Sequence, residues 1–207
     1  IGTTGHSSLP DVLFNLDLIK LKNTYNNFKS DKDYNNILTN IFNNYYKDWP
    51  QKYIIDRGEW ATPANYALLF KYFYQDIKII FLLRNPIDVI KSYIELCNNH
   101  PNFYINQQYN ELDKTSLHRT ELEEKIELIT KKGDLVDWSF MAYNFIKDKK
   151  NVHFVKYEDL VKSPAKILKD IYDFLNIPKF KHNFNIKDQF SINNISYNDD
   201  VMGAPMH

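Results

Sequence analysis

One stretch of the chain decides the fold: residues 77–93 read IKIIFLLRNPIDVIKSY. Its start is apolar apart from Lys78, and short runs of this kind, rich in β-branched residues, are typical of buried strands. Asn85 then precedes Pro86, a pair typical of a helix start because asparagine caps the first turn and proline has a suitable fixed φ. The stretch therefore predicts a strand that delivers Arg84 to its end and a helix that begins at Pro86.

Strands and helices alternate along the rest of the chain. Further strands are predicted at 53–55 and 152–155, and helices at 11–21, 33–46, 63–74, 86–96, 117–129, 135–146 and 164–175. This alternation predicts an α/β fold with three layers, in which a mostly parallel central sheet is flanked by helices on both faces. Ligands of such sheets bind at the carboxyl ends of the strands.

Composition narrows the class of protein. The 207 residues suffice for one sizeable core, so we predict a single domain over 1–207. Lysine plus arginine equals aspartate plus glutamate at 26 each, which argues against nucleic acid or an anionic membrane as partner. Cys97 is the single cysteine and no signal peptide is visible in residues 1–10, so we expect a cytoplasmic protein without a disulfide. The scattered histidines predict no metal site.

Arg84 and Ser92 are the first candidates for a binding site. An arginine guanidinium grips a phosphate with two parallel hydrogen bonds, and a serine hydroxyl adds a neutral donor. The two side chains together could hold one phosphate. The alternative is that Arg84 forms a salt bridge with a neighbour such as Asp88, and that Ser92 is an ordinary helix residue.

Two motifs resemble those of sulfotransferases. Residues 84–92 are similar to the family's 3′-phosphate-binding motif, in which a strand ends in Arg-Asp/Asn-Pro and a serine follows eight positions after the arginine. Residues 154–164, FVKYEDLVKSP, resemble the family's Tyr-Glu-Asp-Leu segment, and residues 167–177 resemble the helix that follows it. The resemblance implies a P-loop-like sulfotransferase fold and transfer of a sulfuryl group from 3′-phosphoadenosine-5′-phosphosulfate to a hydroxyl or amine acceptor. It places Arg84 and Ser92 on the 3′-phosphate and Tyr157 near the nucleotide.

A third element, residues 53–60, reads YIIDRGEW. It resembles the family's strand that delivers a basic residue, and in some branches a catalytic base, to the sulfuryl group. In-line transfer needs positive charge at the bridging oxygen and a base for the acceptor proton. Arg57 is the candidate cation, and Glu59 is the first candidate base because burial in a pocket raises a carboxylate pKa. A plain surface carboxylate is the alternative for Glu59, and His6 is a further candidate base.

The two ends of the chain carry weaker resemblances. Residues 1–4, IGTT, are similar to part of the family's 5′-phosphosulfate loop. Gly5 and Pro10 interrupt the helix that should follow that loop, so we expect the loop to lie upstream. Gly203 resembles the start of the family's C-terminal nucleotide-covering loop, without its usual basic residues. We therefore expect a domain truncated at both ends.

Two other functions remain open from the sequence. A nucleotide or sugar kinase of similar fold would need a Gly-x-x-x-x-Gly-Lys-Ser/Thr loop, and the chain has none. A non-catalytic nucleotide-binding relative that has kept the fold is the other alternative, because the donor loop is absent and the base is uncertain. The acceptor could be a small molecule, a glycan or a protein hydroxyl, with Trp60, Phe103, Tyr104 and Tyr109 either lining its pocket or packing in the core.

Overall fold

The computed structural model describes residues 2–3, 8–24, 31–73, 76–114, 119–131, 135–184, 191–192 and 195–196. The chain divides into two compact units, one of Ile1–Ile79 with Met141–Val152 and one of Ile80–Phe140 with His153–His207. Each unit contains a cluster of buried apolar side chains. The single domain expected from the chain length stays a prediction.

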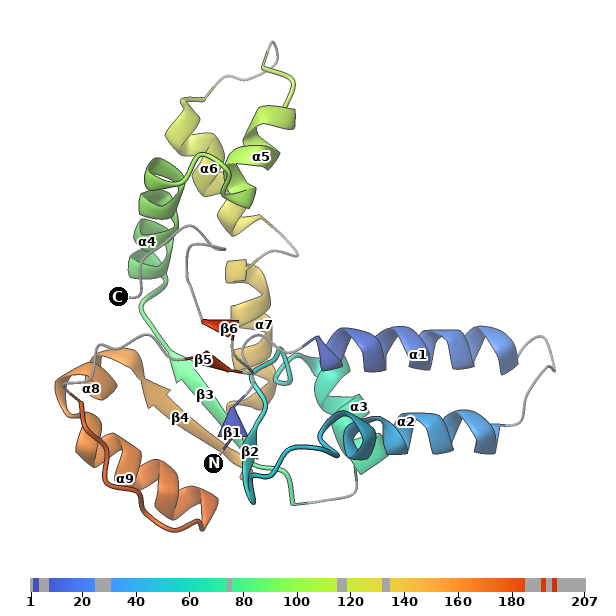
Figure 1. Ribbon diagram of the computed structural model, residues 1–207. Helices are drawn as coiled ribbons and strands as arrows, with labels where there is room; N and C mark the ends of the chain where they lie inside the picture. The colour runs from blue at the N-terminus through green and yellow to red at the C-terminus, as the bar shows by residue number, and fades with distance from the viewer. Residues whose placement is uncertain are drawn as a thin grey trace. The chain divides into compact units, whose positions relative to one another are not determined.

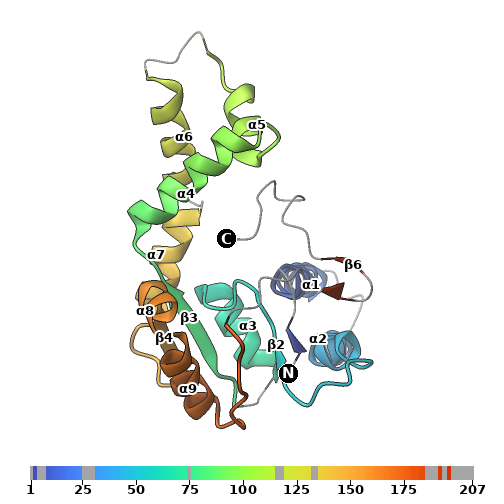
Figure 2. The same cartoon turned by 60° about the vertical axis from the view of Figure 1, so that its left-hand side comes forward.

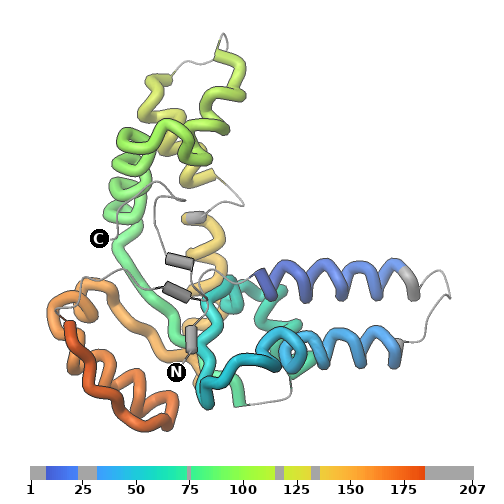
Figure 3. Tube along the Cα trace, viewed as in Figure 1, coloured from blue at the N-terminus to red at the C-terminus, as the bar shows by residue number. Residues whose placement is uncertain are grey.

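The first unit combines a short parallel strand pair with helices. Its elements are β1 (Gly2–Thr3), α1 (Leu9–Thr24), α2 (Asp31–Tyr45), β2 (Ile54–Ile55) and α3 (Pro63–Phe73), and it takes in the end of α7 (Leu135–Ile146). β1 and β2 are parallel, with Gly2 opposite Ile54 and Thr3 opposite Ile55. α1 and α2 run antiparallel side by side (Figures 1 and 3).

Packing among α1, α2 and α3 forms the core of the first unit. Leu13 and Leu38 are fully buried there. The other buried members of the cluster are Leu9, Trp60, Leu68, Leu69 and Tyr72. Because helical residues three and four positions apart share a face, Leu9, Leu13 and Leu16 bring one side of α1 onto this core.

The second unit contains the motif-bearing strands. Its elements are β3 (Ile79–Leu83), α4 (Pro86–Asn99), α5 (Tyr104–Glu111), α6 (Glu121–Thr130), β4 (Val152–Lys156), α8 (Tyr157–Lys162), α9 (Pro164–Leu175), β5 (Ser191–Ile192) and β6 (Ile195–Ser196). β3 and β4 are hydrogen-bonded neighbours, and their arrows point the same way in Figure 1. β5 and β6 form an antiparallel pair.

Helices α4, α5 and α6 pack against one another through a second apolar cluster (Figure 2). Phe103, Ile105 and Ile129 are buried in it. The Asn106 side-chain amide donates hydrogen bonds to the carbonyls of Cys97 at 2.8 Å and His100 at 2.9 Å. This amide fastens α5 to the end of α4, and Phe103 therefore packs in the core rather than lining an acceptor pocket.

The predicted α/β class is confirmed, with a smaller sheet than expected. Within the described residues the strands pair two by two, as β1–β2, β3–β4 and β5–β6. β1 and β2 have only two residues each. The strand predicted at 53–55 therefore forms only a short pairing with β1. None of the helices in the described ranges has the length and apolar composition needed to cross a bilayer.

A charged cluster joins α1 to α3 in the first unit. Asp17 accepts hydrogen bonds from the Lys71 ammonium at 2.9 Å and from the Tyr72 hydroxyl. Burial by itself would raise the pKa of Asp17, but these hydrogen bonds and the charges of Lys71 and Lys20 outweigh burial and lower it below the ordinary value of 3.8. The ionised form of Asp17 therefore stabilises the contact between the two helices.

We expect Asp17→Asn to lower the free energy of unfolding by about 1–3 kcal/mol at pH 7, because Tyr72 and Lys71 lose their charged acceptor. A lowered carboxylate pKa stabilises the fold above the unfolded pKa, and the contribution is lost as the pH falls through the folded pKa. Urea unfolding should thus show a difference between wild type and variant that shrinks below pH 3.8. Asp48→Asn, at an exposed aspartate of the same unit, is the control. A difference independent of pH would contradict this assignment.

Candidate donor-nucleotide site

The junction between β3 and α4 presents Arg84. β3 ends at Leu83, and Asn85 caps α4 by accepting a hydrogen bond from the Ile87 amide at 3.0 Å. Pro86 occupies the first helical turn, where its missing N–H leaves no intrahelical bond unmade. Arg84 is therefore held between a hydrogen-bonded strand and a capped helix, and its side chain is exposed.

The junction between β4 and α8 presents Tyr157 at an equivalent position. Tyr157 directly follows β4 and is the first residue of α8. Because β3 and β4 are neighbours and run the same way, residues that follow their carboxyl ends lie close together. The Arg84 guanidinium carbon lies 4.5 Å from the centroid of the Tyr157 ring. The structure thus joins the two sequence motifs in one contact.

This contact orients a positive charge without neutralising it. An exposed cation–π contact is worth about 0.5–1 kcal/mol. The Tyr157 ring carries no formal charge, so the positive charge of Arg84 is kept, and an arginine has five N–H donors with which to meet an anion. A bound anion could meet Arg84 while its guanidinium remains over the ring.

The salt bridge considered as an alternative for Arg84 is not found. Asp88 pairs instead with Lys91 one turn along α4, at 3.9 Å. Among the described residues no carboxylate forms an ion pair with Arg84, whose interaction is with the Tyr157 ring. The charge of Arg84 is accordingly available for a ligand.

Ser92 lies on α4 in the same unit and is half-buried. It follows Asn85 by seven residues, which is close to two full turns, so both residues lie on one face of the helix about 10 Å apart along its axis. The assignment of Arg84, Ser92 and Tyr157 to donor binding stays a prediction.

The end of β2 carries the residues predicted for catalysis. Arg57 and Glu59 are both exposed, and they belong to the first unit, whereas Arg84 belongs to the second. The Glu59 carbonyl accepts hydrogen bonds from the Asn65 amide at 3.0 Å and the Thr62 hydroxyl at 3.2 Å. The loop backbone is thus anchored, but its exposed carboxylate lacks the burial on which we based its role as a base. The roles of Arg57 and Glu59 stay predictions.

Asp56 is the ordered carboxylate at this strand end, and the sequence analysis missed it. It directly follows β2 and accepts hydrogen bonds from the Tyr46 hydroxyl and from the Trp60 indole N–H, the latter at 3.1 Å. Asp56 directly follows a predicted strand, as Arg84 and Tyr157 do, and this position could have marked it as a candidate in the sequence. These two hydrogen bonds hold the carboxylate in place, which suits an anchor for the loop.

The helix after residues 1–4 is not interrupted at Pro10, contrary to the expectation from the sequence. Gly2–Thr3 is a strand, and Pro10 is the second residue of α1, where a proline does not interrupt a helix. Gly58 packs against this helix start, because an added Cβ would lie 2.9 Å from the Pro10 ring. The position of the family's 5′-phosphosulfate loop stays a prediction. Residues 4–7, including the candidate base His6, lie outside the described residues, as does Gly203.

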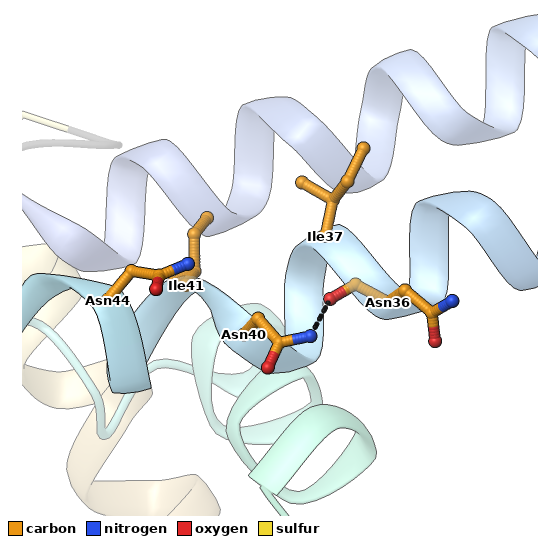
Figure 4. A pocket seen from close by; sticks show the side chains of 5 residues that line it. All are labelled: Asn36, Ile37, Asn40, Ile41 and Asn44. Atoms are coloured by element: carbon orange, nitrogen blue, oxygen red, sulfur yellow. Dashed lines mark hydrogen bonds between the residues drawn. The ribbon is translucent and has the colours of Figure 1, made fainter.

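Two further features of the described residues bear on other kinds of site. No group of three His, Cys, Asp or Glu side chains is placed there to hold a metal ion. A shallow hollow lies on α2, lined by Asn36, Ile37, Asn40, Ile41 and Asn44 (Figure 4). The Asn40 amide donates to the Asn36 carbonyl at 2.8 Å. The hollow includes none of the predicted site residues.

Comparison with known proteins gives a family match. The sulfotransferase domain model matches residues 59–201, which is more than half of the chain and includes Glu59, Arg84, Ser92 and Tyr157. A solved sulfotransferase domain from the curacin biosynthetic pathway is 20% identical, with a TM-score of 0.48 over 69% of this chain and 45% of its own. The chain therefore spans less than half the length of that structure. No curated protein gives a significant match.

We expect Asn85→Ala to lower the free energy of unfolding by about 0.5–2 kcal/mol, because the first turn of α4 loses its capping acceptor. Asn85→Ser is the matched control, since a serine hydroxyl can accept the same hydrogen bond. Chemical denaturation measures both variants. Equal losses in the two variants would show that the cap does not stabilise the junction beside Arg84.

Proposed function

Because the chain belongs to the sulfotransferase domain family, we propose that it transfers a sulfuryl group from 3′-phosphoadenosine-5′-phosphosulfate to a hydroxyl or amine acceptor by in-line displacement. The observation that carries this proposal is the contact of Arg84 with Tyr157, which unites two motifs more than seventy residues apart at the ends of neighbouring strands. One residue of the contacting pair lies in each family motif, which would not be expected of two unrelated surface residues.

The donor's 3′-phosphate suits the face that these residues offer. Arg84 supplies two parallel charge-assisted hydrogen bonds, and Ser92 supplies a neutral one from α4. Tyr157 supports the guanidinium from behind with its ring and adds an aromatic edge for the nucleotide. These side chains hold the donor in place, and none of them takes part in bond making.

Transfer itself needs groups at the other end of the donor. The acceptor oxygen or nitrogen attacks sulfur, and the bond from sulfur to the bridging oxygen breaks, with its electron pair going to the departing bisphosphate. We assign Arg57 to stabilise the negative charge that develops on that oxygen, and Glu59 to take the acceptor proton. This chemistry requires no metal ion and no covalent enzyme intermediate.

The proposal extends to the setting of the reaction. The single cysteine and the balanced charge of the chain support a reducing, cytoplasmic location and an acceptor other than nucleic acid. The acceptor is then a small molecule, a glycan or a protein hydroxyl.

Donor binding is tested by titration calorimetry of the full chain with 3′,5′-bisphosphoadenosine. We expect Arg84→Ala to weaken binding about 10- to 100-fold, since it removes charge-assisted hydrogen bonds worth about 1.5–3 kcal/mol, and Ser92→Ala about 2- to 10-fold. Lys91→Ala is the matched control, because it removes one positive charge from α4 at a residue that pairs with Asp88. Absence of binding to the wild type, or equal losses in Arg84→Ala and Lys91→Ala, would refute the donor site.

Turnover is tested with radiolabelled 3′-phosphoadenosine-5′-phosphosulfate and a panel of hydroxyl and amine acceptors. We expect Arg57→Ala and Glu59→Gln to lower kcat by about 10²-fold or more while donor affinity changes little. Glu95→Gln, at an exposed position on α4, is the control. Unchanged kcat in Glu59→Gln removes Glu59 from the mechanism, and donor binding without turnover on any acceptor favours a non-catalytic relative.

A further inference from the structure

Helix α1 carries a second apolar stripe besides the one that faces its core. The core-facing positions include Leu9 and Leu13, which are buried. On another side of the helix, Phe14, Leu18 and Leu21 are 39%, 37% and 51% exposed. Their spacing of four and then three residues places them in one row along the helix. A solvent-facing apolar row on a helix that already has a buried face is typical of an interaction surface.

The two ends of this row carry opposite charges. Asp11 lies in the first turn of α1 and Lys22 in the last, and both are exposed. At 100° per residue the two side chains point in nearly the same direction, next to the apolar row. In the part of the chain that the structure describes, neither residue forms an ion pair. Along the helix, this surface is therefore acidic at its N-terminal end, apolar in the middle and basic at its C-terminal end.

We propose that α1 is a dimerisation surface, on which the α1 of a second copy of this chain packs antiparallel. A two-fold axis level with residue 17 brings Phe14 of each copy close to Leu21 of the other and lets the long Lys22 side chain reach Asp11 at both ends. Two-fold interfaces use the same patch on both copies, and this patch is complementary to itself only in the antiparallel direction. In a parallel pair, like charges would meet at both ends.

The size of the surface sets the strength of the dimer. α1 has 16 residues and is therefore about 24 Å long. One helix pair buries less than the roughly 800 Å² per partner of a standard stable interface. The dimer is accordingly weak, with a dissociation constant of about micromolar or above, and it forms in a concentration-dependent way.

Charge reversal gives the sharpest test, by sedimentation velocity of the full chain from about 1 to 300 µM. Wild type is expected to shift from monomer towards dimer over this range. Asp11→Lys and Lys22→Asp alone should each weaken the dimer about 5-fold or more, and the double reversal should restore it because both end contacts re-form with exchanged signs. Thermal unfolding separates dimer formation from helix stability. The double reversal places an unfavourable charge at each end of the helix dipole, so its melting temperature should stay lowered although the dimer re-forms.

Disulfide trapping locates the axis independently. Leu18→Cys is expected to crosslink two copies under mild oxidation, whereas Ile19→Cys, at the next residue and similarly exposed at 45%, faces another direction and should not. The native Cys97 is buried and gives no background. A wild type that stays monomeric throughout, a double reversal that fails to restore association, or equal crosslinking of the two cysteine variants overturns the proposal.

Discussion

A guanidinium over an aromatic ring is the interaction on which the site depends. Arg84 and Tyr157 lie 4.5 Å apart although they are far apart in sequence, and only the pairing of β3 with β4 brings them together. Each is the first residue after its strand, so the strand pairing brings the two side chains together. The Asn85 cap then starts α4 immediately beyond Arg84, and Ser92 follows within this helix.

In each unit a polar side chain directly follows a strand. In the second unit the residues are Arg84 and Tyr157, and in the first unit Asp56 holds this place, with Tyr46 and Trp60 donating to its carboxylate. The strands of the first unit are short, and side-chain contacts such as those of Asp17 with Lys71 and Tyr72 join its helices.

Local signals in the sequence predicted the elements that have local causes. Pro86 and Pro164 mark helix starts correctly, although only Asn85 makes the capping hydrogen bond and Ser163 makes none. The helix expected from 117 begins at Glu121, because Thr120 and Glu123 form a reciprocal capping box. That Thr-x-x-Glu spacing was readable in the sequence.

Features that depend on distant contacts could not be predicted in this way. The strand at Gly2–Thr3 exists through its pairing with β2, and a two-residue strand leaves no periodic pattern. The short helices α5 and α8 were not predicted. The Asn106 hydrogen bonds to the end of α4 hold α5 in place. The residues Tyr157–Glu158–Asp159 of α8 were interpreted only as part of a family motif. The exposure of Glu59 likewise depends on the fold around it, which a strand-end position alone does not determine.

The most direct test of the account is a crystal structure of the chain with 3′,5′-bisphosphoadenosine bound. The account predicts two guanidinium nitrogens of Arg84 at roughly 2.7–2.9 Å from oxygens of the 3′-phosphate, with the guanidinium still over the Tyr157 ring and the Ser92 hydroxyl on the same phosphate. A nucleotide bound elsewhere, or an Arg84 side chain turned away from the phosphate, would contradict it.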